Sequence, residues 1–470
     1  MKNNPEMQRK TGVMICRDPA RFCDAGFVSC RTLFFAALLM CGSVAPARAV
    51  TLNDALAQTL QKNPYILQAK SALESAAGER LVLRSVAFPK GLIGGIAGDQ
   101  GGQRSSTSSD QLFAFAYGSF LQPLFHAGIP ASLRRGDLAL LIAQQQLNVA
   151  VVEELHRARL AFYSALYNRS LQSLGETQRA RLEENIAGEK ALYEAGQSDR
   201  GALIAATLLA RELDPQIEGA RSAYGAAIVQ LAQSIGQSLG RGAILPSPEG
   251  SLDFQAVDLR SQDEVERALK RRVDLKLARL LILAAREDQR IIQAGYYPSL
   301  DAVASGEAIP VSGIHRDSGG SPQASDDTVA SEVRGGASYT WRVIDNGEVG
   351  GAVSRQRATR ETNELELHKL EANIPRELAR LQNNLVATTA RYRSLAQAAE
   401  VAERNVASVQ ENRAHGLASV LDFRTAESSL LVTRRGLLTA VFEQNVALAE
   451  WDRASGRYFQ FSGDTFKNVH

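Results

Sequence analysis

Two stretches of this chain alternate strictly between two kinds of side chain. Residues 113–118 (FAFAYG) alternate aromatic and small residues without interruption. Residues 333–343 (VRGGASYTWRV) place Val, Gly, Ala, Tyr, Trp and Val on one face, and the other face includes Arg334 and Arg342. A period of two along the sequence predicts β-strands.

Each alternating stretch has a partner segment before it. A glycine-rich run at 91–98 precedes the first, and a polar stretch with turn composition at 99–110 separates the two. The second stretch pairs with a segment that begins near residue 300. The sequence therefore predicts one strand pair at about 91–125 and another at about 300–345.

A helical period follows each predicted strand pair. Apolar residues recur every three or four positions from Leu367 to Val409, and a comparable seam runs from Leu140 to Phe162. A seam sustained over this length favours a coiled coil. About 60 residues at ~1.5 Å each give a helix of roughly 90 Å, which suits spanning a gap better than building a compact enzyme.

A glycine ends each long helix, and a second helix returns from it. Gly196 precedes a predicted return helix at 199–236, and Gly416 precedes one at 419–456. Chance similarity between two Ala-rich helices would also explain this likeness.

An upstream match argues against chance. Phe88-Pro89 matches Tyr297-Pro298, at an offset slightly shorter than the one that relates Gly196 to Gly416. The difference falls in a longer polar loop at about 311–332. We interpret the chain as a tandem duplication, with repeat 1 at 50–250 and repeat 2 at 251–470.

The N-terminus carries an export signal. Arg31 precedes an apolar run at 32–44, and Ala47-Arg48-Ala49 follows as a cleavage pattern. These features predict a signal peptide at 1–49 that is cleaved after Ala49, whether translation starts at Met1 or at Met14. A lipoprotein cleavage box ending at Cys41 is a poor match. All four cysteines precede the cut, so the mature chain has none.

Composition narrows the possible functions. The formal net charge is +2, which gives no polybasic surface for nucleic acid. The six histidines are scattered without ligand spacing, so we expect no metal site, no cofactor and no catalytic constellation. No run after the signal peptide reaches the ~20 apolar residues of a membrane helix.

The alternating stretches fit either sandwich strands or strands of a membrane barrel. Charged residues opposite Tyr and Trp suit a wall with a wet lumen on one side and lipid on the other. On that interpretation Arg334 and Arg342 lie in the barrel lumen. The aromatic residues then face the membrane: Phe113, Phe115, Tyr117, Tyr339 and Trp341.

Four strands cannot close a barrel by themselves, because known barrels have at least eight. Two copies would supply eight strands and a filled interior, and three copies would supply twelve and an open lumen. Small residues and arginine on the inner face favour twelve. The predicted fold class is mainly α with membrane β: a trimeric 12-stranded β-barrel continued by a long α-helical barrel.

Several short motifs occur in the order and spacing of one family. They are TLNDAL (51–56) with Asn63-Pro64, LQPLFHAG (121–128), its repeat VIDNG (343–347), and the G-x-x-x-V-L-D pattern from Gly416 to Asp422. Over essentially the whole mature chain, the sequence resembles the TolC family of outer-membrane efflux proteins.

The resemblance implies location and partners. It implies a homotrimer in the outer membrane of a Gram-negative bacterium, in contact with outer-membrane lipid, with its α-barrel in the periplasm. It also implies docking to a periplasmic adaptor (membrane fusion protein) and to an inner-membrane transporter of the RND, ABC or MFS type.

The resemblance also implies site residues at the helix turns. Gly196, Gly416 and Leu417 would contact the adaptor, and Asp422 would form a carboxylate ring that gates the pore, with Asp199 as a weaker equivalent. The family has a second acid three residues after the first, where this chain has Thr425. An acid favoured at a helix N-terminus is the alternative explanation of Asp422.

The sequence therefore predicts a passive exit duct for efflux or type I secretion, not an enzyme. A periplasmic coiled-coil tether without a pore is the main alternative, and the strand pairs argue against it. An exported enzyme with helical arms is a further alternative, but it lacks any site. The cargo is not readable from the sequence.

Overall fold

The computed structural model describes residues 49–104, 107–238, 240, 245–257, 261–311 and 328–458. The predicted signal peptide falls almost entirely outside the described residues. Ala49, the predicted cleavage residue, lies in the short strand β1 (Ala49–Val50), which pairs in parallel with β4 (Ser247–Pro248).

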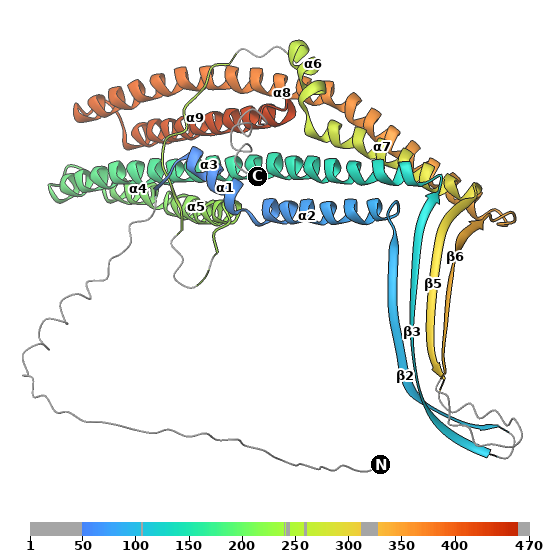
Figure 1. The fold of residues 1–470 in the computed structure, drawn as a ribbon. Coiled ribbons are helices and arrows are strands. Elements are labelled where there is room, and N and C mark those ends of the chain that lie inside the picture. Colours follow the sequence, from blue (N-terminus) through green and yellow to red (C-terminus); the bar gives the residue numbers. More distant parts are fainter. Residues whose placement is uncertain are drawn as a thin grey trace, which may run out of the picture. The chain divides into compact units, whose positions relative to one another are not determined.

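The first half of the described chain runs from helices into a strand pair and back into helices (Figure 1). Its elements are α1 (Leu52–Lys62), α2 (Pro64–Ser85), β2 (Lys90–Arg104), β3 (Thr107–Phe125), α3 (Ile129–Glu194), α4 (Arg200–Arg211) and α5 (Asp214–Ser234). The second half repeats this order. Its elements are α6 (Ser261–Arg271), α7 (Val273–Gln293), the 3-10 turn η1 (Ala294–Tyr296), β5 (Ser299–Val311), β6 (Thr328–Thr340), α8 (Glu348–Ala414) and α9 (Val420–Ala454).

The two halves begin their elements in the same register. One constant offset in residue number relates the starts of α1, α2 and β2 to those of α6, α7 and β5. A larger offset relates the start of α3 to that of α8, and the starts of α4 and α9 nearly keep it. The offset rises within the strand pair, where β5 and β6 are separated by more of the chain than β2 and β3.

One predicted helix is broken in the structure. The return helix expected at 199–236 is two helices, because α4 ends at Arg211 and α5 begins at Asp214. Pro215 lies in the first turn of α5, where its missing N–H costs nothing but where a continuous helix would lose a hydrogen bond. The corresponding residue of α9 is Arg435, and α9 is unbroken.

The strands form one antiparallel sheet in the order β2-β3-β5-β6. The strands of the first pair are longer than predicted: β2 continues to Arg104 and β3 resumes at Thr107, so most of the polar stretch 99–110 is strand rather than turn. The second pair is shorter at its end, because β6 stops at Thr340. Much of the predicted loop at 311–332 lies outside the described residues.

The long helices organise the packing. α3 has 66 residues and α8 has 67, which corresponds to about 100 Å each. α3 packs against α2, α4, α5, α7 and α9, and α8 packs against α7 and α9. Leu378 and Leu381 of α8 are buried with Trp451 of α9, in a cluster that also contains Leu275 of α7. The return helix therefore seals the seam of the long helix.

Left-handed glycines end the helices at equivalent positions. Gly196, Gly236, Gly416 and Gly456 all have φ between +70° and +72°. Gly236 also packs tightly, because a Cβ there would overlap the carbonyl oxygen of Lys62. Both the backbone conformation and the close approach therefore require glycine at that position.

We expect the alanine variants of these glycines to differ in stability. Gly416→Ala meets open space, so it should cost only the left-handed backbone strain, about 1 kcal/mol. Gly236→Ala should cost clearly more, because the backbone at Lys62 must also move. Gly219→Ala, in open space within α5, is the matched control and should stabilise the protein by about 0.5–1 kcal/mol. Chemical denaturation measures all three, and equal losses for Gly236→Ala and Gly416→Ala would contradict the steric argument.

Candidate functional site

The two turns between long and return helices have the same hydrogen-bonding pattern. Gly196 N–H donates to the Tyr193 carbonyl (3.0 Å), and Gly416 N–H donates to the Arg413 carbonyl (3.0 Å). In each turn the next residue donates to the carbonyl five positions before it, at 2.8 Å, which completes a Schellman motif. Leu417 follows the second glycine and is 79% exposed. This turn thus presents a bare apolar side chain on a fixed backbone.

The two acids singled out at these turns cap helices. Asp199 accepts a hydrogen bond from Ala202 N–H (2.6 Å) at the start of α4. Asp422 forms a capping box with Ser419 at the start of α9: Ser419 N–H donates to Asp422 Oδ2 (2.9 Å), and Asp422 N–H donates to Ser419 Oγ (3.1 Å). The hydrogen bonds from the Ser419 backbone and hydroxyl lower the pKa of Asp422 below its usual value.

The capping box accounts for Asp422 without a gate. Its carboxylate is exposed at the turn and remains charged at neutral pH. Thr425, which replaces the family's second acid, donates its hydroxyl to the Leu421 carbonyl at 2.8 Å. A single carboxylate per chain is therefore left at this level of α9, and its role in gating stays a prediction.

Buried polar contacts join the two helical hairpins near these turns. Arg413 of α8 pairs with Glu189 of α3, which is only 2% exposed, and also donates to Asn185. Gln178 of α3 donates to the buried Glu427 of α9. Sequence reasoning missed all of these residues, because each belongs to a helix whose surface charges look alike and the partners belong to different repeats.

A cavity of about 700 Å³ lies between the same helices. Its lining includes Arg181, Glu184, Glu403 and Arg434, together with Arg413. Arg413 also stacks over Phe423, with 5.2 Å from its guanidinium carbon to the ring centroid. The hairpins are therefore joined here both by polar contacts around a cavity and by an apolar cluster that contains Leu182 of α3 and Phe423 of α9.

The sheet separates charge onto one face. Side chains are described for residues 90–98, 114–125, 299–308 and 331–340 of its strands. In an antiparallel sheet, paired residues point to the same side and neighbours in the chain to opposite sides. The register places every charged side chain of these segments on one face, which we call the charged face: Lys90, Asp301, Glu307, Glu332 and Arg334.

The opposite face, which we call the small-residue face, is apolar apart from Gln122 and Ser331. Ile93 and Val333 on this face are 90% and 84% exposed in the single chain. Its other residues are mainly glycine and alanine, among them Ala116, Ala304 and Ala337. It also carries a few larger side chains, among them Phe120 and Tyr339.

This register corrects the predicted faces of the first repeat. Tyr117 pairs with Glu307, and Glu307 pairs with Glu332, so Tyr117 lies on the charged face together with Arg334. Phe115 lies on the same face, two positions before Tyr117. The lumen assignment of Arg334 and the membrane assignment of Phe115 and Tyr117 therefore exclude each other.

The error has a physical cause. Alternation within one strand defines two faces but does not say which one meets lipid, and only pairing with a charged strand decides it. Phe113 belongs to β3, but its side chain lies outside the described set. Tyr339 lies on the small-residue face, opposite Arg334, as the second repeat alone predicted.

Two further predicted residues lie beyond the sheet. Trp341 and Arg342 follow the end of β6 at Thr340. The Trp341 indole N–H donates to the Tyr296 carbonyl at 3.3 Å, and Arg342 pairs with Glu348 at the start of α8 at 2.6 Å. Both side chains thus fasten the strand–helix junction, which argues against the predicted lumen role of Arg342 within a strand.

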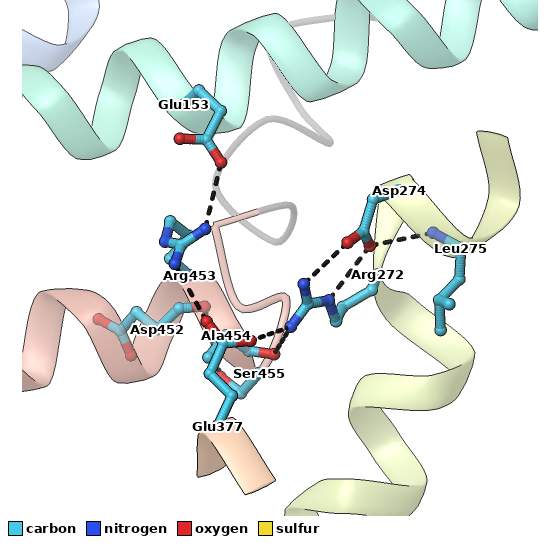
Figure 2. Close-up of polar contacts among 9 residues, drawn as sticks. All are labelled: Glu153, Arg272, Asp274, Leu275, Glu377, Asp452, Arg453, Ala454 and Ser455. Atoms are coloured by element: carbon cyan, nitrogen blue, oxygen red, sulfur yellow. Dashed lines mark hydrogen bonds and ion pairs between the residues drawn. The ribbon is translucent and has the colours of Figure 1, made fainter. Parts of the chain in front are cut away.

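An ion-pair network ties together the helices of the second repeat (Figure 2). Arg272, between α6 and α7, binds Asp274 at 2.8 Å, Glu377 of α8 at 2.7 Å and the Ala454 carbonyl at 3.3 Å. Arg453 of α9 binds Glu377 at 3.1 Å and Glu153 of α3 at 3.3 Å. Burial alone would lower the pKa of Arg272, but Asp274 and Glu377 outweigh it and raise the pKa above its usual value.

In the first repeat, an amide side chain makes the contacts that correspond to those of Arg272. Asn63 is the counterpart of Arg272 in the register of the repeats, and its Nδ2 donates to the Ser234 carbonyl (2.8 Å) and to Glu154 of α3 (2.9 Å). Ser234 ends α5 as Ala454 ends α9. Each repeat therefore binds the last carbonyl of its return helix and one glutamate of its long helix from the same joint.

Known proteins resemble this chain in sequence and in fold. Residues 265–457 match the family model described as "Outer membrane efflux protein", which covers most of the second repeat. Over these residues the chain is similar to the outer membrane efflux protein family. None of the curated protein sequences matches the chain closely enough to count as a relative.

Solved structures of low sequence identity share the fold of both repeats. The outer membrane protein VceC of Vibrio cholerae matches with a TM-score of 0.69 at 18% identity, over 86% of this chain and 96% of its own. The CmeC outer membrane channel of Campylobacter jejuni gives 0.73 at 14%, over 89% and 88%. The MtrE outer membrane channel of Neisseria gonorrhoeae gives 0.68 at 18%, over 88% and 93%.

Two kinds of feature are absent from the described residues. No group of three or more His, Cys, Asp or Glu side chains there is arranged to hold a metal ion. No helix there combines the length and apolar character that crossing a membrane would take.

We expect Ser419→Ala to weaken the start of α9. It removes the hydroxyl that accepts from Asp422 N–H, a loss that typically costs about 1 kcal/mol. Because the pKa of Asp422 is lowered in the folded protein, the cap is intact above pH ~4 and is lost as the pH falls through the folded pKa. The protection of amides 420–424 against hydrogen exchange, relative to their intrinsic rates at the same pH, should therefore fall at acid pH in the wild type and already at pH 7 in Ser419→Ala. Ser428→Ala in the same helix is the control. It should change neither the stability of the start of α9 nor the hydrogen exchange at 420–424.

Arg272→Ala should destabilise the second repeat more than a surface change does. It leaves Asp274 and the Ala454 carbonyl without their guanidinium partner at a joint where Arg272 is only 13% exposed. We expect a loss of about 2 kcal/mol, below the full cost of breaking a buried pair because Glu377 keeps Arg453. Lys270→Ala, in an exposed pair, should have no measurable effect. Equal denaturation midpoints for the two variants would contradict a structural role for the network.

Proposed function

We propose that this chain is the outer-membrane exit duct of a tripartite efflux system. The observation that carries the proposal is the four-stranded sheet, with charge on one face and apolar residues on the other. A sheet of this kind suits a wall between water and lipid. The outer strands β2 and β6 need partners there, because hydrocarbon offers none to backbone N–H and C=O groups.

Closure by copies of the same chain meets that need. Three copies supply twelve strands, enough for an open lumen, whereas two supply eight, whose interior side chains fill. Long helices attached to the strands would continue the duct into the periplasm. The cleaved signal peptide predicted at 1–49 is consistent with export, and the family and fold neighbours are outer-membrane proteins by their descriptions.

The helix turns are the proposed contact with the pump side. Gly196 and Gly416 hold rigid turns, and exposed Leu417 offers an apolar contact for a periplasmic adaptor. An inner-membrane transporter of the RND, ABC or MFS type would supply the energy, since a conduit needs no catalytic group. Service to a type I secretion system is the alternative assignment of the same duct.

The tether alternative is weaker on the same observation. A periplasmic coiled-coil protein without a pore has no use for a sheet with exposed Ile93 and Val333 on one face. Both interpretations are compatible with the long helices, so only the sheet distinguishes the duct from the tether.

Planar-bilayer recording tests the duct and the gate together. The purified protein should show stepwise conductance. If Asp422 gates the entrance, Asp422→Ala should raise the conductance or the open probability, because a ring of carboxylates is removed. Asp422→Glu is the control and should behave as the wild type. Conductance that is unchanged in Asp422→Ala would leave Asp422 as a helix cap only, and no conductance in any variant would overturn the duct.

A further inference from the structure

The sheet register assigns a role to residues that the helix turns do not involve. We propose that the charged face is the inner face of the barrel and that Tyr117, Glu307, Glu332 and Arg334 form a lumen row that makes the barrel prefer cations. This inference rests on the proposed duct and deepens it. It also reverses the membrane-facing assignment of Phe115 and Tyr117.

The cost of charge in lipid decides between the faces. All five described charged side chains of the sheet lie on one face. Turning that face to hydrocarbon would place Arg334, Glu307 and Glu332 in lipid, a placement that strands of membrane barrels avoid. Turning the small-residue face to lipid buries none of the charged side chains that the structure describes in the sheet.

Three members of the lumen row lie at one level across neighbouring strands, and Arg334 lies two positions further along β6. Gly94 pairs with Tyr117, Tyr117 with Glu307, and Glu307 with Glu332. A Cβ at Gly94 would overlap the ring of Tyr117, so the ring covers the glycine of the neighbouring strand. An aromatic side chain on an inner face is thereby laid flat along the wall.

The charges of the row do not cancel. Arg334 donates two hydrogen bonds to Glu332, from Nε at 2.7 Å and from a terminal nitrogen at 2.8 Å. Glu307 lies directly opposite Glu332 in the register, so two carboxylates share one cation. The described charged face carries two cations, Lys90 and Arg334, and three carboxylates. Its net charge is therefore one negative charge per chain. Repeated around a pore, such charges attract cations and repel anions.

A neighbouring pair of cysteine variants tests the face directly. Ser305 and Ala304 are adjacent small residues of β5, with Ser305 paired to Arg334 on the charged face and Ala304 paired to Gly335 on the other. Produced without residues 1–49, the chain holds no other cysteine. In proteoliposomes, Ser305→Cys should react with a charged, membrane-impermeant thiosulfonate, and Ala304→Cys should react only with a lipid-soluble maleimide.

The labelling has two outcomes that overturn the inference. They are reaction of Ala304→Cys with the charged reagent while Ser305→Cys is protected, and equal reaction of both. Because labelling needs no ion current, the expected pattern in a protein without conductance would retain the face assignment and reject the duct.

Reversal potentials in a KCl gradient test the selectivity. Glu307→Gln should shift the K⁺/Cl⁻ permeability ratio toward one, and Arg334→Gln should shift it the other way, toward stronger cation preference. The opposed signs serve as the internal control, since a general loss of structure would move both variants together. Ratios unchanged in both variants would show that selectivity is set elsewhere and would overturn the lumen row.

Discussion

Unpaired backbone groups at the edges of a four-stranded sheet constrain the whole molecule. β2 and β6 are the outer strands of the described sheet, and in hydrocarbon each unpaired N–H or C=O carries a cost of several kcal/mol. Closure with further copies removes that cost. The tandem repeat follows from the same constraint, because each repeat supplies one strand pair and one pair of helices that must continue it.

The helices of the two repeats are held together at equivalent joints. Each repeat fastens the end of its return helix to the joint between its first two helices, through Asn63 in one repeat and Arg272 in the other. Gly236 and Gly456 bring the chain against the same joints. The duplication has therefore preserved a contact geometry while changing its chemistry from an amide to an ion-pair network.

Periodicity in the sequence predicted the fold class, the four strands and the long helices, since hydrophobic spacing and glycine breaks are local signals. It did not predict the break before Asp214, although Pro215 was the available signal. It also placed Phe115 and Tyr117 on the wrong side relative to Arg334, because alternation is local whereas register depends on a strand of the other repeat. The pairing of Glu189 with Arg413 was not predicted either, because it also joins residues of different repeats.

The mass of the assembled protein in lipid nanodiscs tests the central claim most directly. Native mass spectrometry of the mature chain should give a particle of three copies, which corresponds to twelve strands and a closed sheet without edges. A stable particle with any other number of copies would contradict the account.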